Sequence, residues 1–67
     1  TQAQFVVISA LRDEDQPLSL KDLHDILKRN RIDMTYDAAK MMLLRMVEAG
    51  QLWKAGHGLY AMADQKS

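Results

Sequence analysis

Residues 34–50, MTYDAAKMMLLRMVEAG, constrain the fold more than any other stretch of this 67-residue chain. Thr35 is a residue type that caps helix starts, and Gly50 is the type that most often follows a helix end. The residues between them are mostly strong helix formers. Their apolar members recur at the spacing of one helical face, at Ala39, Met42, Leu43, Met46 and Ala49. The pattern predicts a helix over residues 35–49 whose apolar side packs against the rest of the chain.

The segment after this helix has the signature of a β-hairpin. Residues 51–62, QLWKAGHGLYAM, contain two short apolar runs on either side of a Gly-His-Gly tip. Short apolar runs separated by glycine favour two strands joined by a tight turn. We therefore predict a hairpin with residues 54–58 at its tip. Alternation along the first strand puts Leu52 and Trp53 on opposite faces, so that Trp53 is partly exposed if Leu52 faces the core. Residues 63–67 are predicted to be a frayed tail.

The start of the chain is predicted to be a further helix. Residues 3–13 carry apolar side chains at helical spacing, which indicates a buried face formed by Phe5, Val7, Ile8 and Leu11. The β-branched run within residues 5–8 would also suit a strand. We prefer the helix because the residues that follow continue the pattern without a turn signal. Pro17 ends this region, since proline disfavours helical conformation in the residue before it.

A second short helix is predicted between Ser19 and Asn30. Ser19 with Asp22 three residues later resembles a capping box. The helix that it opens, residues 20–29, has apolar side chains on one face at Leu20, Leu23, Ile26 and Leu27. Asn30 tolerates the left-handed conformation that ends a helix, and a short link then leads into the 35–49 helix. Two helices joined in this way form a helix-turn-helix. Residues 17–19 are predicted to be extended and able to pair with the hairpin as a third strand.

The charges of the chain sum to zero but are unevenly distributed. Acidic residues predominate over residues 1–27, whereas Lys and Arg predominate over residues 28–58. A polarised distribution of this kind favours a surface that meets an anion. Because the chain begins at Thr1 and not at Met, we expect residues 1–62 to be one domain of a longer protein.

The residue inventory argues against several functional classes. The chain has no Cys, no glycine-rich phosphate loop and no Ser–His–carboxylate motif, so we predict no catalytic residues and no enzyme activity. His24 and His57 lack partners at the spacing of zinc sites, so no metal and no cofactor are expected. No apolar run is long enough to cross a bilayer and no signal peptide is present. We therefore expect no membrane partner and a cytoplasmic, intracellular location.

These features together resemble the winged helix-turn-helix family over nearly the whole chain. The resemblance rests on SLKDLHDILKRNRIDMTYDAAKMMLLRMVEAG and on the wing GQLWKAGHGLYAM, with Gly50-x-Leu52 followed by Gly56-x-Gly58-x-Tyr60. It implies an α+β, mostly α fold of three helices and a hairpin wing, to which a short third strand can be added. The wing is similar to those of bacterial regulators, antitoxin-type modules and plasmid or phage replication proteins. Roles in transcription regulation or DNA replication are implied by that similarity.

The resemblance also implies a DNA-binding surface. In DNA-binding members the second helix of the motif lies in the major groove, and the wing touches a neighbouring groove or the backbone. Here helix 35–49 would enter the groove and wing 54–58 would meet the backbone of duplex DNA, which would make the protein nucleoid-associated. The DNA-binding residues implied are Lys21, Arg29, Arg31, Thr35, Tyr36, Asp37, Lys40, Met41, Arg45, Lys54 and His57. Phosphate contacts would position the domain, while contacts to base edges would give sequence preference.

Two other functions remain open from the sequence. Helix 35–49 has Lys40 and Arg45 as its only cations and carries Asp37 near its start, which is unusual for a helix that reads DNA. An interface with a protein partner or a second copy of the chain would instead use the apolar side chains of Met41, Leu44 and Trp53. RNA binding is the third function, with Tyr36 and Trp53 as its stacking residues.

Overall fold

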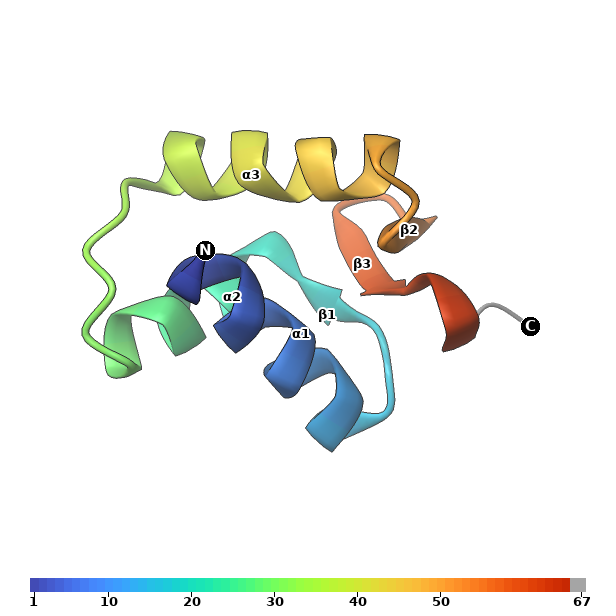
Figure 1. The fold of residues 1–67 in the computed structure, drawn as a ribbon, viewed down its shortest axis with the longest axis horizontal. Coiled ribbons are helices and arrows are strands. Elements are labelled where there is room, and N and C mark those ends of the chain that lie inside the picture. Colours follow the sequence, from blue (N-terminus) through green and yellow to red (C-terminus); the bar gives the residue numbers. More distant parts are fainter. Residues whose placement is uncertain (66–67) are drawn as a thin grey trace.

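Three α-helices and a three-stranded antiparallel sheet make up the computed structural model, which describes residues 1–65 (Figure 1). In chain order the elements are α1 (Gln2–Glu14), β1 (Leu18–Ser19), α2 (Leu20–Arg29), α3 (Tyr36–Glu48), β2 (Leu52–Gly56), β3 (Leu59–Met62) and the 3-10 helix η1 (Ala63–Gln65). The strand order β1-β3-β2 adds the predicted third strand to the hairpin. The predicted α+β winged helix-turn-helix topology is confirmed.

Side-chain caps fix where α2 and α3 begin. Thr35 Oγ1 accepts a hydrogen bond from the Ala38 amide at 3.1 Å, and Ser19 Oγ accepts one from the Asp22 amide at 3.1 Å. Each bond satisfies an amide that has no partner within its own helix. The two caps predicted from the sequence are therefore present, and α2 has the predicted bounds.

Gly50 ends α3 as predicted. Its φ is +80°, its amide donates to the Val47 carbonyl at 3.0 Å, and the Gln51 amide donates to the Met46 carbonyl at 3.0 Å. These two bonds form a Schellman motif, in which glycine adopts the left-handed conformation without steric cost. The chain reverses at Gly50 and enters β2 shortly afterwards.

The end of α2 differs from the prediction by one residue. The expectation that Asn30 is left-handed is wrong, because Asn30 has φ −92° and Arg31 has φ 62°. Asn30 Nδ2 instead donates a hydrogen bond to the Ile26 carbonyl at 2.8 Å, which keeps Asn30 out of the left-handed region. The reversal falls on Arg31, whose amide donates to the Lys28 carbonyl at 2.9 Å. A residue with a Cβ is strained at this positive φ.

Replacing Arg31 with glycine is expected to stabilise the fold. Glycine adopts this positive φ without the Cβ penalty, although it also gains freedom in the unfolded chain. The net gain in the free energy of unfolding should be about 0.5–1 kcal/mol, measured by urea denaturation followed by circular dichroism. The matched control is Asn30→Gly, at a negative φ, which should lower the stability. Equal effects of the two substitutions would contradict this explanation of how α2 ends.

Apolar side chains from every α-helix and from the hairpin meet in one core. The largest fully buried side chains among them are Val7, Leu11, Leu23, Leu27, Leu43, Met46 and Leu52. Burying a leucine side chain contributes roughly 1.5–3 kcal/mol. In Figure 1, α3 lies above α1 and α2, with the hairpin below its C-terminal end. One side of α3 therefore packs against the core, and its other sides are open to solvent.

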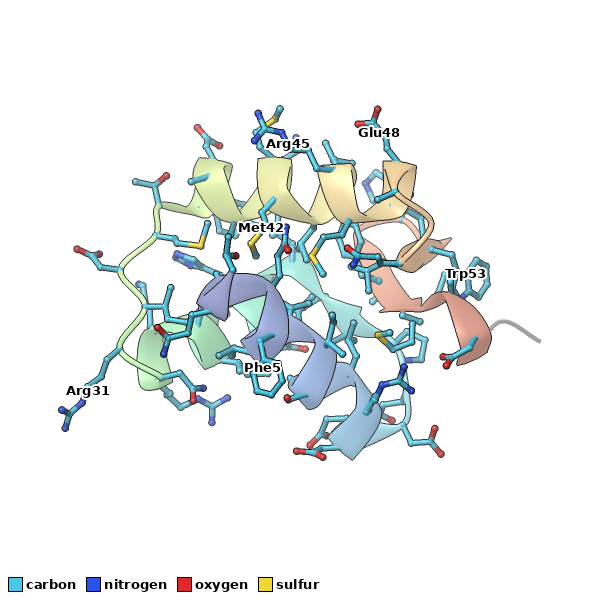
Figure 2. The ribbon with its side chains drawn as sticks, in the orientation of Figure 1. Phe5, Arg31, Met42, Arg45, Glu48 and Trp53 are labelled. Atoms are coloured by element: carbon cyan, nitrogen blue, oxygen red, sulfur yellow. The ribbon has the colours of Figure 1, made fainter. Side chains whose placement is uncertain are left out.

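Two residues predicted to be buried lie on the surface. Phe5 is 70% exposed, and Ala49, the C-cap residue that follows the last residue of α3, is exposed as well. The buried positions of α1 are Val7 and Leu11, which lie on one side of the helix. Phe5 precedes Val7 by two residues, a rotation of roughly 200° about the helix axis, so its ring lies on the outside of α1 (Figure 2). The predicted burial of Phe5 and Ala49 is wrong.

The C-terminal segment contacts α1. The predicted tail at residues 63–67 begins with η1, while residues 66–67 lie outside the described residues. Asp64 of η1 forms an ion pair with Arg12 of α1, with 3.3 Å between Oδ2 and Nη1. Both side chains are more than half exposed to solvent, so this pair contributes little to the stability.

Candidate nucleic-acid interface

A β-bulge shapes the wing. In the hairpin Lys54 lies opposite Tyr60 and Gly56 lies opposite Leu59, so that Ala55 is an extra residue in β2. Bulges of this kind bend a strand and increase its local twist. The strand therefore bends directly after Lys54, one of the predicted phosphate contacts.

A backbone hydrogen bond holds the wing tip against α2. His57 and Gly58 form the turn between β2 and β3, and Gly58 has φ +70°, which glycine adopts without strain. The Leu20 amide, at the start of α2, donates to the Gly58 carbonyl at 3.2 Å. The wing tip and the first turn of α2, which carries Lys21, are thus held together by the backbone itself.

Basic side chains from three parts of the fold line one depression, which we call the wing-side depression. Lys21 comes from the first turn of α2, Lys40 from α3, and Lys54 and His57 from the wing. The other lining residues are Ser19, Leu20, Tyr36, Gly58 and Tyr60. Among the residues described, no carboxylate lines this depression, so its lining carries only positive charge.

At this surface Tyr36 contacts His24, a residue to which the sequence analysis gave no role at the site. The rings of the two residues meet edge to face, with their centroids 5.5 Å apart and an interplanar angle of 86°. His24 Nε2 donates a hydrogen bond of 2.8 Å to the Met34 carbonyl, and since a carbonyl only accepts, this nitrogen carries a proton. His24 thereby connects α2 to the link before α3. No sequence signal indicated this contact, because its partners lie ten or more residues further along the chain.

The two cations of α3 lie on different flanks of the helix. Lys40 lines the wing-side depression, whereas Arg45 lines a second depression with Met41, Met34 and the first residues of α1. A separation of five residues turns the helix by roughly 140°, which explains the difference. Figure 2 shows Arg45 projecting from α3 away from the core. Lys40 and Arg45 therefore do not form one patch.

The remaining predicted DNA-binding residues lie apart from the wing-side depression. Arg29 lines a groove between α1 and α2, and Arg31 lies beside Lys28 and Asp33 in the link after α2, at the far end of the molecule in Figure 2. Thr35 caps α3 with its hydroxyl, and Asp37 is an exposed residue in the first turn of that helix. Of the predicted set, the fold therefore brings together Lys21, Tyr36, Lys40, Lys54 and His57.

The apolar residues predicted for a protein interface do not line one depression together. Met41 is 50% exposed, whereas Leu44 and Trp53 are half-buried. Leu52 is buried beside Trp53, as the alternation along β2 predicts. Met41 shares its depression with Arg45, and neither Leu44 nor Trp53 lines it.

Two further features bear on partners. Within residues 1–65 no group of three or more His, Cys, Asp or Glu side chains is arranged to hold a metal ion. Over the same residues no helix combines the length and the apolar character needed to cross a membrane.

The resemblance to winged helices rests on the topology of the fold and not on a detectable relative. The three α-helices and the β1-β3-β2 sheet give that topology directly. Comparisons of the chain with protein-family models, curated proteins and solved structures found no match.

Proposed function

We propose that this chain is a winged-helix module that binds duplex DNA, with α3 in the major groove and residues 54–58 of the wing on the phosphate backbone. The observation that supports this function is the wing-side depression, which Lys21, Lys40 and Lys54 line together and which no carboxylate lines among the residues described. In a helix-turn-helix the second helix enters the groove while the first helix crosses the backbone. The three lysines belong to these two helices and to the wing, as that docking requires.

The phosphate contacts of this proposal come from α2 and the wing, and Lys40 and Arg45 add further contacts from the two flanks of α3. Lys21 lies in the first turn of α2, where the helix dipole adds to the attraction of a phosphate. Lys54 and His57 approach the same DNA strand as Lys21, from the wing. The Leu20–Gly58 hydrogen bond holds the wing in position. Contacts of this kind orient a protein on the duplex without reading its sequence.

Sequence preference in this proposal comes from the outer side of α3. Asp37 and Met41 are exposed one helical turn apart between the flanks that carry Lys40 and Arg45. Asp37 has only acceptors to offer, which suits the cytosine amino group, and Met41 suits the methyl group of thymine. Arg45, on the flank opposite Lys40, is free to meet a phosphate of the other strand.

The wider role that we propose follows from the resemblance to winged helices. A module of this size would add affinity or site selection to a larger regulatory, replication or mobile-element protein. It would then act inside the cell, at the nucleoid. A stable complex at physiological salt would draw on further contacts from the rest of such a protein, because this chain carries no net charge.

An NMR titration of the isotope-labelled chain with a mixed-sequence duplex, at low salt and again at higher salt, tests the proposal. DNA binding predicts amide shifts concentrated at residues 35–45 and 56–58 that fade as salt rises, because salt competes with phosphate contacts. No shifts at either salt would overturn the proposal. Concentration-dependent broadening around Leu44 and Trp53 would then favour the alternative, a winged helix used for protein interaction.

The double substitution of Lys40 and Arg45 with alanine tests the role of α3. Loss of two phosphate contacts should weaken DNA binding by about 10- to 60-fold at 0.1 M salt, measured by fluorescence anisotropy. The control is Lys28→Ala with Arg31→Ala, which removes the same charge at the far end of α2 and should have a smaller effect. Unchanged affinity in the Lys40/Arg45 variant would remove α3 from the DNA interface.

A further inference from the structure

Phe5 is the most exposed large apolar side chain of the described residues. It is 70% exposed, compared with 50% for Met41 and 48% for Tyr36. It borders a groove between α1 and α2 whose floor and walls include Val6, Ala10 and Ile26. An exposed phenylalanine ring beside a partly apolar groove is the kind of anchor that protein interfaces use.

Charges of both signs line the same groove. Asp13 and Glu14 lie at the C-terminal end of α1, and Arg29 lies at the C-terminal end of α2. Within residues 1–65 none of these three side chains forms an ion pair. The groove therefore carries an acidic site and a basic site, both of which have charge available for a partner.

We propose that this face, defined by Phe5, Ala10, Asp13, Glu14, Ile26 and Arg29 and called the α1–α2 face, binds a second copy of this chain about a two-fold axis. In a two-fold pair each patch contacts the same patch of its partner, so a face that carries both signs of charge can be complementary to itself. With the two α1 helices antiparallel, Asp13 and Glu14 approach the partner's Arg29, and the two Phe5 rings fill the paired grooves.

The α1–α2 face shares no residue with the wing-side depression. Pairing through the α1–α2 face leaves the proposed DNA-binding surface of each copy open. A dimer would then hold two DNA-binding surfaces in a fixed relation, which raises the overall affinity for a duplex with two half-sites. The inference itself concerns self-association and does not depend on whether the chain binds DNA.

Sedimentation equilibrium of the chain without DNA, up to about 1 mM, tests this interface. We expect a mass that rises with concentration from the 7.6 kDa of the monomer towards twice that value. Phe5→Ser should weaken the association at least tenfold, whereas Phe5→Leu should change it less. Circular dichroism would verify that both variants remain folded, as expected for an exposed position. A chain that is monomeric throughout this range, or a dimer that Phe5→Ser leaves unchanged, would overturn the proposal.

A charge-swapped pair of variants gives the sharper test. Arg29→Glu makes the face wholly acidic, and Asp13→Arg with Glu14→Arg makes it wholly basic, so each variant alone should be monomeric. Mixed together, the two should form a one-to-one heterodimer, because each acidic site then faces a basic one. Lys28→Glu is the control for charge in general, since Lys28 lies outside the face. Failure of the mixture to associate would show that the charges of this face do not contact one another. If the unaltered chain is monomeric and its α1–α2 face binds a different protein, the proposal of a second copy as the partner is overturned.

Discussion

Replacing Lys21, Lys40 and Lys54 with alanine in one chain is expected to weaken the binding of duplex DNA by about 100- to 500-fold at 0.1 M salt. Each phosphate that a lysine neutralises releases counterions, which contributes a slope of about 0.9 to log affinity against log salt. At 0.1 M salt this corresponds to roughly eightfold per contact, and three independent contacts multiply. Of the variants considered, this one should weaken DNA binding the most, because its three lysines line one depression.

Fluorescence anisotropy across a series of salt concentrations would measure both the affinity and its slope. The slope should fall by about 2.7 in the triple variant. The matched control replaces Lys28, Arg29 and Arg31 with alanine, which removes the same charge from the far end of α2. This control should lose less than about tenfold, because those cations lie outside the proposed contact. Equal losses of affinity in the two triple variants would mean that binding depends only on the net charge of the chain.

The triple variant should remain folded, which makes the comparison clean. Lys21, Lys40 and Lys54 are exposed, and exposed substitutions away from caps and cores usually change the free energy of unfolding by about 0.5 kcal/mol or less. Urea denaturation of the two triple variants checks this. A large loss of stability in the lysine variant would assign the three side chains to the fold and not to a partner.

The sequence predicted the parts of the fold that local signals encode. Ser19 and Thr35 marked the starts of α2 and α3 because a side-chain oxygen must satisfy the free amides there. Gly50 marked the end of α3 because only glycine takes its positive φ freely. These local rules were sufficient to place helices, turn and wing in the right order, and the order of elements determined the topology.

The prediction failed where competing local contacts decided the outcome. Asn30 was the better left-handed residue by type, but its side chain bonds the Ile26 carbonyl, and the reversal moved to Arg31. Phe5 was assigned to the same buried helix face as Val7, although residues two apart lie on nearly opposite sides of a helix and Val7 is the one that faces the core. Residue type alone could not rank these alternatives, because each depends on the rotation of a helix or on a single hydrogen bond.

The candidate site was predictable as a set of residues but not as a surface. Lys21, Lys40 and Lys54 come from three elements, and only the packing of α2, α3 and the wing brings them to one depression. Arg45 was grouped with Lys40 because both lie on α3, yet the helix turns them to different flanks. The His24–Tyr36 contact had no local signal at all.

Replacing Leu43 with alanine is expected to cause the largest loss of stability of any variant considered. Leu43 is completely buried in the middle of α3 and belongs to the same core as Leu11, Leu23 and Leu52. Truncating a buried leucine costs about 2–5 kcal/mol, through the lost transfer free energy and the cavity that remains. A domain of this size has a total stability of about 3–10 kcal/mol, so a large fraction of the variant should be unfolded near physiological temperature.

The control for this variant is Leu44→Ala, which makes the same chemical change one position along the same helix. Leu44 is half-buried, so its truncation should cost about 1 kcal/mol, and urea denaturation would resolve the two values. Adjacent positions on a helix differ by roughly 100° of rotation, so the ratio of the two losses reports how α3 is turned against the core. Similar losses would mean that α3 is rotated from the orientation described, and Lys40 would then no longer face the wing. The stability of two neighbouring leucine variants thus tests the orientation of α3, on which the proposed DNA interface depends.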